Sequence, residues 1–302
     1  MDITVRIGNK TLKNPVGVAS GTFGYGQEYA PFLDINNLGA IYTKAITPEV
    51  REGNPTPRIV ETPGGMLNAI GLANVGLDNF ISQKLPFLKK YQGATIVNVA
   101  GRSEEDYCQV VERLNGFEEV WGYEINISCP NVKCGGISFG TDPVLVESLV
   151  GQLRKRTQKP LIIKLTPNVT DITITAKAAV SGGADALSCI NTLKGMLIDT
   201  KSKKPVLSNV TGGLSGPAIL PVGIALTYQV AKAVDIPIVG LGGIMTANDA
   251  IQYLLAGASA VQIGTANFVD PTITEQVLEG IINYMKQEKL EKIEDFHQFL
   301  LA

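Results

Sequence analysis

The sequence has little of what commonly supplies a catalytic base, and its charge balance gives no sign of a nucleic-acid-binding surface. Its 302 residues include one histidine, His297, close to the C-terminus. Histidine is the side chain used most often as a general base, so this role must fall to another residue. Lysines and arginines number 26 against 28 aspartates and glutamates, which gives a net charge of −2 instead of a strongly basic chain.

Long apolar runs are also absent. No stretch reaches the roughly 18 apolar residues of a transmembrane helix, and the first ten residues lack the apolar segment of a signal peptide. We therefore expect a cytoplasmic protein that binds neither membrane nor nucleic acid, with its four cysteines as free thiols. Cys129 and Cys134 lie five residues apart, but no second pair completes a zinc pattern, so no metal site is predicted.

What the chain does contain is a series of short apolar runs rich in β-branched residues, with helical patterns between them. Runs that are apolar on both faces are typical of parallel strands covered by helices. Eight such βα units predict an α/β protein whose single domain, residues 1–302, is a (β/α)8 TIM barrel. The expected strands are 15–19, 40–44, 95–99, 123–127, 161–165, 184–189, 237–241 and 260–264.

Local signals add detail to this expectation. Helices are expected to begin after Ser103, at Asp142-Pro143 and after Thr246, because capping residues and an early proline stand there. Residues 3–7 and 10–12 flank Gly-Asn and predict a hairpin at the bottom of the barrel. Three long connections, 46–75, 129–141 and 192–216, follow strand C-termini, the face on which barrels place their active sites. They are candidate ligand walls and lids.

Polar residues and glycines follow the predicted strands. Emergence into solvent accounts for some of them, but not for two lysines and three asparagines at the ends of very apolar runs, since burying an unpaired lysine is costly. These residues favour an anionic or electron-rich ligand at the mouth of the barrel. In chain order they are Ser20-Gly21, Lys44, Asn98, Asn126, Lys164, Asn191-Thr192, Gly242-Gly243 and Gly264-Thr265.

Two further patterns suggest chemistry at this mouth. The glycine pairs after strands seven and eight are typical of a phosphate site, although Gly-Gly also marks any tight turn. Cys129 begins a long loop directly after a strand and precedes Pro130. A buried structural role is the commoner fate of a free thiol and fits Cys108 and Cys189. The position of Cys129, and its ordinary pKa of about 8.5, favour it as a catalytic base.

Several motifs together resemble class 1 dihydroorotate dehydrogenases, nearly from end to end. They are EINISCPN at 124–131 followed by the loop NVKCGG, GGMLNAIGLANVG at 64–76, KLTPN at 164–168, INTLKGM at 190–196, GGLSGPAI at 212–219 and GLGGI at 240–244. The resemblance implies oxidation of dihydroorotate to orotate in pyrimidine synthesis, with FMN as the hydride acceptor and Cys129 as the base. Lys164 would stabilise negative charge on the flavin, and the 129–141 loop would close over the site.

The resemblance also implies two sets of binding residues. The FMN positions are Ser20, Lys44, Ala45, Asn98, Asn126, Lys164, Ile190, Gly216, Gly242, Gly243, Gly264 and Thr265. The substrate positions are Lys44, Asn68, Ala69, Ile70, Gly71, Leu72, Asn126, Asn191 and Thr192.

The subclass follows from the loop sequences. The serine base and N-terminal extension of the quinone-linked class are absent, and NVKCGG and NAIGL resemble the NAD-linked branch, although Cys134 stands where that branch often has histidine. This branch implies a homodimer core in a heterotetramer with a subunit that carries FAD and a 2Fe-2S cluster. The alternatives are a fumarate-linked homodimer, a dihydrouridine synthase, a flavin-free phosphate-binding barrel and an idle scaffold subunit.

Overall fold

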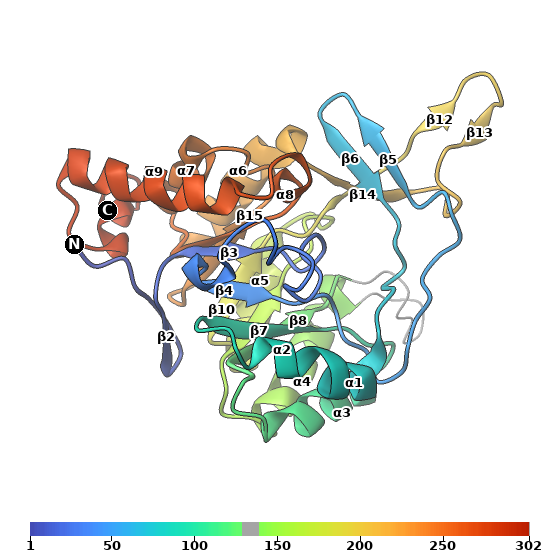
Figure 1. Cartoon of the computed structure of the whole chain (residues 1–302), viewed down its shortest axis with the longest axis horizontal. Helices are drawn as coiled ribbons and strands as arrows, with labels where there is room; N and C mark the ends of the chain where they lie inside the picture. Colours follow the sequence, from blue (N-terminus) through green and yellow to red (C-terminus); the bar gives the residue numbers. More distant parts are fainter. Residues whose placement is uncertain (129–138, 302) are drawn as a thin grey trace.

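A computed structural model describes residues 1–128 and 139–301, and a closed barrel of parallel strands forms its centre (Figure 1). The predicted TIM barrel is confirmed, because each of the eight predicted runs overlaps one of its strands and none is off by more than two residues at either end. Around the barrel, β3 is followed by β4, β7, β8, β9, β10, β15 and β16, which pairs with β3 again. Their bounds are β3 Val16–Val18, β4 Ala40–Tyr42, β7 Ala94–Val99, β8 Gly122–Asn126, β9 Leu161–Lys164, β10 Ala186–Cys189, β15 Ile238–Leu241 and β16 Ala260–Ile263.

Helices lie between successive strands and pack around the barrel. The three predicted helix starts are confirmed: Ser103 and Thr246 accept hydrogen bonds from the backbone N–H three residues on, and Asp142 caps the helix that begins at Pro143. No described helix combines the length and hydropathy of a membrane span. The α-helices are α1 Gly76–Asn79, α2 Leu85–Leu88, α3 Glu104–Asn115, α4 Pro143–Arg154, α5 Ile172–Ser181, α6 Leu220–Ala231, α7 Ala247–Leu255, α8 Ala266–Val269 and α9 Ile273–Glu288. The 3-10 helices are η1 Ile35–Asn37, η3 Phe139–Thr141, η4 Pro217–Ile219 and η5 Ile293–Phe299, and η2 Phe80–Lys84 is a π-helix.

The predicted N-terminal hairpin is also present. Its strands β1 (Val5–Ile7) and β2 (Lys10–Leu12) pair antiparallel. The Lys10 ammonium donates to the Trp121 carbonyl oxygen at 3.0 Å, immediately before β8, so the hairpin lies at the N-terminal end of the barrel. His297 is at this end too, because its ring contacts the carbonyl oxygen of Ala258, just before β16, at 3.1 Å.

At the opposite end, two of the long connections combine into a sheet that their sequences did not predict. The 46–75 segment supplies β5 (Ile59–Thr62) and β6 (Gly65–Asn68), and the 192–216 segment supplies β11 (Leu193–Gly195) and β14 (Gly212–Ser215). They form one antiparallel sheet in the order β11-β14-β6-β5. Figure 1 shows this sheet and the β12–β13 hairpin (Ile198–Asp199, Lys204–Pro205) standing away from both termini. These candidate ligand walls, which look like loops in the sequence, are therefore partly strands.

Candidate active site

Parallel strands bring the predicted polar residues to one mouth. Asn126 and Lys164 end neighbouring strands, β8 and β9, and are paired in register. Asn98 lies in β7 on the other side of β8, and the Asn191 amide approaches Asn126 Oδ1 at 3.4 Å. The predicted clustering of these four side chains is thus what the structure shows.

Beneath Asn126 lies a buried carboxylate, Glu124, that the sequence analysis did not single out. Its side chain is fully buried. Oε2 accepts from Asn98 Nδ2 at 2.6 Å and lies 3.5 Å from Lys164 Nζ. Oε1 accepts from Ser188 Oγ at 2.7 Å and from Gln262 Nε2 at 2.6 Å. Because β8 and β16 are four strands apart in either direction, the contact with Gln262 crosses the barrel interior.

This carboxylate fixes the orientation of the Asn98 amide. An ionised carboxylate only accepts hydrogen bonds, so the NH2 group of Asn98 must face Glu124. Its Oδ1 then points away and, although fully buried, has no hydrogen-bond partner in the structure. A buried acceptor left unpaired is costly, and such an atom at the floor of a mouth is what a ligand N–H would satisfy.

Lys44 is affected by the charge of another cation, Arg58, which the sequence analysis did not single out. Lys44 follows β4 and is half-buried. Burial, and to a smaller extent the charge of Arg58, lower the pKa of the Lys44 ammonium. Among the described residues, Arg58 donates to the backbone carbonyls of Glu52 and Asn54. A bound anion would relieve the repulsion between these two cations.

The glycines predicted to bind phosphate lie in turns around the start of α6. Gly216, Gly242 and Gly243 all have positive φ. A Cβ on Gly243 would lie 2.6 Å from the Leu220 nitrogen, the first residue of α6, so only glycine fits there. Thr265, just after β16, donates from Oγ1 to Ser215 Oγ at 2.8 Å. Backbone N–H groups, two hydroxyls and a helix N-terminus are the donors that phosphate sites use.

The predicted substrate segment 68–72 continues from the mouth sheet. Asn68 ends β6 and its amide approaches the Gly213 carbonyl oxygen at 3.4 Å. Asn54 donates from its backbone to Ile70 and from its side chain to Ala69. Gly71 and Leu72 both have positive φ, 75° and 59°. Glycine adopts this conformation readily, whereas leucine does not, and hydrogen bonds from Asn54 hold the two residues before this turn.

The remaining predicted residues are placed as follows. Thr192 accepts from the Asn168 amide through its carbonyl oxygen at 3.0 Å. Gly264 lies directly after β16, where an added Cβ would contact Ala19 at 3.4 Å. Three of the predicted FMN residues are buried and stand within three residues of the C-terminal ends of β3, β4 and β10: Ser20, Ala45 and Ile190.

The cysteines divide into two groups. Cys129 and Cys134 lie outside the described residues, so their predicted roles remain predictions. Cys108 and Cys189 are buried free thiols, as expected. Burial raises the pKa of both, that of Cys189 to about 12, which disfavours the thiolate form in each. Ser128, next to Cys129, is held at the mouth: its N–H donates to Asn126 Oδ1 at 3.2 Å and its hydroxyl to the Lys164 carbonyl at 3.3 Å.

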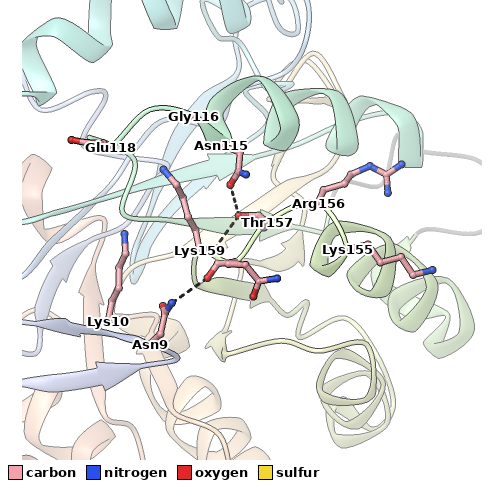
Figure 2. A pocket seen from close by; sticks show the side chains of 10 residues that line it. Asn9, Lys10, Asn115, Gly116, Glu118, Lys155, Arg156, Thr157 and Lys159 are labelled. Atoms are coloured by element: carbon pink, nitrogen blue, oxygen red, sulfur yellow. Dashed lines mark hydrogen bonds between the residues drawn. The ribbon is translucent and has the colours of Figure 1, made fainter.

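A separate cavity of about 560 Å³ opens at the other end of the barrel, next to the N-terminal hairpin (Figure 2). Lys10 and Lys159 line it together with Asn115 and Thr157. Lys159 donates to the carbonyl oxygens of Phe117 and Val120, so its ammonium is already bound to backbone. None of the predicted site residues lines this cavity, and the mouth remains the candidate active site.

Comparison with known proteins identifies the family of the chain. The dihydroorotate dehydrogenase family model matches residues 2–285. The catalytic subunit of dihydroorotate dehydrogenase B (NAD(+)) from Alkaliphilus metalliredigens is 55% identical, with 98% of this chain and 97% of that protein covered. The subunit of the same name from Geotalea daltonii is 54% identical, with 97% and 96% covered.

A solved structure shares the fold. The dihydroorotate dehydrogenase of Eimeria tenella, in complex with ferulenol, superposes with a TM-score of 0.80 at 24% identity and covers 97% of this chain and 87% of its own. At that identity the likeness concerns the fold alone. The family match over almost the entire chain, and full-length relatives at more than half identity, show that the chain belongs to the dihydroorotate dehydrogenase family.

Proposed function

We propose that this chain is the catalytic subunit of an NAD-linked dihydroorotate dehydrogenase, which oxidises (S)-dihydroorotate to orotate in pyrimidine synthesis. The observation that carries the proposal is the set of polar groups at the mouth: the buried Lys164, the buried and unpaired Asn98 Oδ1, and the half-buried Lys44 and Arg58. A cationic, amide-rich, mostly buried site is suited to a flat heterocycle with an anionic group. The relatives that carry this name match the chain over nearly its full length.

The groups at the mouth fit FMN as the cofactor. Asn98 Oδ1 supplies an acceptor for a ring N–H, and Lys164 supplies a positive charge beside the same floor. Gly216, Gly242, Gly243, Gly264 and Thr265 would hold the phosphate. When bound, FMN supplies the acceptor for the hydride. The other proposed contacts are Ser20, Lys44, Ala45, Asn126 and Ile190.

Dihydroorotate has a carboxylate and two ring amides. We propose that Lys44 binds the carboxylate with help from Arg58, since both charges attract an anion and the attraction is stronger in a half-buried site than in water. The amides need both donors and acceptors, which asparagine side chains provide. The proposed substrate residues, besides Lys44, are Asn68, Ala69, Ile70, Gly71, Leu72, Asn126, Asn191 and Thr192.

Cys129 is the proposed general base. It removes a proton from one ring carbon of dihydroorotate while a hydride leaves the neighbouring carbon, so the ring loses two electrons and two hydrogens and gains a double bond. The anchored Ser128 supports this role, because it fixes the chain one residue before the thiol. The 129–141 connection would exclude water from the reacting carbons.

The NAD-linked reaction needs a partner. The relatives are named catalytic subunits, which implies a separate subunit in those enzymes. We propose a partner that carries FAD and a 2Fe-2S cluster and passes the electrons to NAD, around a homodimer of this chain.

Anaerobic stopped-flow absorbance tests the half-reaction without the partner. Purified protein reconstituted with FMN is mixed with L-dihydroorotate. We expect the flavin absorbance to bleach rapidly while orotate accumulates in equal amount. A bound flavin that stays oxidised would refute the substrate, and a chain that binds no FMN would refute the flavoenzyme assignment altogether.

A further inference from the structure

One charged side chain near the mouth has no part in the chemistry proposed above. Glu124 is fully buried inside the barrel and points away from solvent. It lies two residues before Asn126 on β8, hence on the same side of the strand and one layer deeper. Burying a carboxylate costs several kcal/mol unless charges and hydrogen bonds compensate for it. An apolar residue would fill this layer of a barrel more simply, so the carboxylate calls for a reason.

All partners of this carboxylate donate to it. They come from four strands: Asn98 on β7, Lys164 on β9, Ser188 on β10 and Gln262 on β16. Within the described part of the chain, Glu124 is the only ion-pair partner of Lys164. Two of the partners, Asn98 and Lys164, belong to the proposed FMN site, whereas Ser188 and Gln262 do not.

We propose that Glu124 is a positioning residue for the flavin site, and this inference rests on the FMN proposed above. It acts in two ways. It holds the Asn98 amide with Oδ1 turned toward the cofactor, and it balances the charge of Lys164 beneath the flavin ring. A neutral side chain at 124 could also donate to Asn98, so the amide would be free to reverse and present NH2 where an acceptor is needed.

Two substitutions at position 124 distinguish these two roles. Glu124→Gln keeps the shape of the side chain and removes its charge. Glu124→Asp keeps the charge and withdraws the carboxylate by one methylene from Asn98, 2.6 Å away in the native protein. Ser188→Ala is the matched control, since it deletes another hydrogen bond to the same carboxylate and leaves Asn98 and Lys164 untouched.

The measurements are the FMN dissociation constant of the apoprotein, by fluorescence quenching, and the reduction potential of the bound flavin. Both variants should bind FMN at least about ten-fold more weakly, the effect of losing one charge-assisted hydrogen bond. The potential of Glu124→Gln should rise, because a negative charge that opposes reduction is gone. The potential of Glu124→Asp should stay close to that of the native protein, and Ser188→Ala should change neither quantity.

The outcomes distinguish this inference from the proposed function. If the native protein binds FMN and a folded Glu124→Gln protein has native affinity and potential, Glu124 is only a structural residue and the inference is wrong. If Glu124→Gln does not fold, native FMN affinity in Glu124→Asp overturns it instead. If the native apoprotein itself binds no FMN, the proposed function fails and the inference fails with it.

Discussion

At the scale of single residues, the surroundings of a side chain give residues of the same type different chemical properties. Cys108 and Cys189 are buried among apolar groups that disfavour a thiolate. Cys129 directly follows Ser128, which two hydrogen bonds hold beside Asn126 and Lys164. Cys129 itself lies outside the described residues, so its role as the base stays a prediction.

Removal of the proposed base should abolish chemistry and spare the cofactor. We expect Cys129→Ala to bind FMN with native affinity and to lose at least about 99% of the rate of flavin reduction by dihydroorotate, since general bases contribute roughly 10²–10⁴-fold. Anaerobic stopped-flow absorbance measures that rate. Cys108→Ser, which changes a buried thiol in α3, is the control and should keep the native rate. Rapid reduction in Cys129→Ala would show that another group takes the proton.

Because Lys164 and Glu124 form a buried ion pair, we expect the stability changes caused by substituting the two residues to be non-additive. Lys164→Met should lower the free energy of unfolding of the apoprotein by about 3 kcal/mol, because it leaves a buried carboxylate without its counter-charge. The double variant Lys164→Met/Glu124→Gln should lose less than Lys164→Met alone, since no buried charge remains. Urea denaturation of the native protein and the three variants measures the coupling. Strictly additive losses would mean that the two charges do not interact.

At the scale of elements, the site depends on turns that join strands to helices. Tyr253 in α7 donates to the Gly242 carbonyl oxygen at 2.7 Å, which fixes the turn after β15. Gly243 then packs against the first residue of α6. These contacts bring the N-terminus of α6 and the turn after β15 together, so the donors of the proposed phosphate site are arranged before any ligand binds.

A methyl group at Gly243 should disturb this arrangement. Gly243 has a φ of 77°, which costs other residues about 1–2 kcal/mol, and its Cβ would overlap backbone. We expect Gly243→Ala to weaken FMN binding at least about ten-fold through that strain and the displacement of α6. Gly116→Ala, at a glycine with open space around it and negative φ, is the matched control. Equal affinities in the two variants, measured by fluorescence titration, would contradict the proposed phosphate cradle.

At the scale of the whole molecule, the barrel places charge differently at its two ends. The mouth holds Lys44, Arg58 and Lys164, with Glu124 beneath. The other end holds Lys159 in the cavity of Figure 2, where burial chiefly, and the charge of Lys10 next, lower its pKa to about 8. The cations at the mouth are proposed ligand-binding residues, whereas Lys159 donates to backbone carbonyls and links the stability of the fold to pH.

The sign of that pH dependence follows from proton counting. Between about pH 8 and the ordinary lysine pKa near 10.5, the unfolded chain binds more protons at Lys159 than the folded chain does. This group therefore makes the native protein more stable as pH rises through that window. The Tm of the native protein minus the Tm of Lys159→Met should therefore increase from pH 7.5 to pH 9.5. Lys155→Met, at an exposed lysine of the same cavity, is the control. A difference that stays constant with pH would contradict the lowered pKa.

The sequence by itself determined the barrel and the strand ends at which the candidate site residues stand. Apolar runs of the right length indicate eight strands, and residues such as Asn126 and Lys164 stand at their ends, so closing the barrel necessarily brings them together. Caps such as Ser103 are local hydrogen bonds and can be predicted from adjacent residues alone.

The tertiary structure decided what depends on pairing between distant segments. The mouth sheet joins residues about 145 positions apart, such as Asn68 and Gly213, and no local pattern predicts that register. Arg58 gains significance only because the fold brings it near Lys44. Glu124 looks like one more residue of a strand until the closed barrel surrounds it with donors from four other strands. Strand formation is local, whereas the burial and charge of a side chain depend on everything that the fold packs around it.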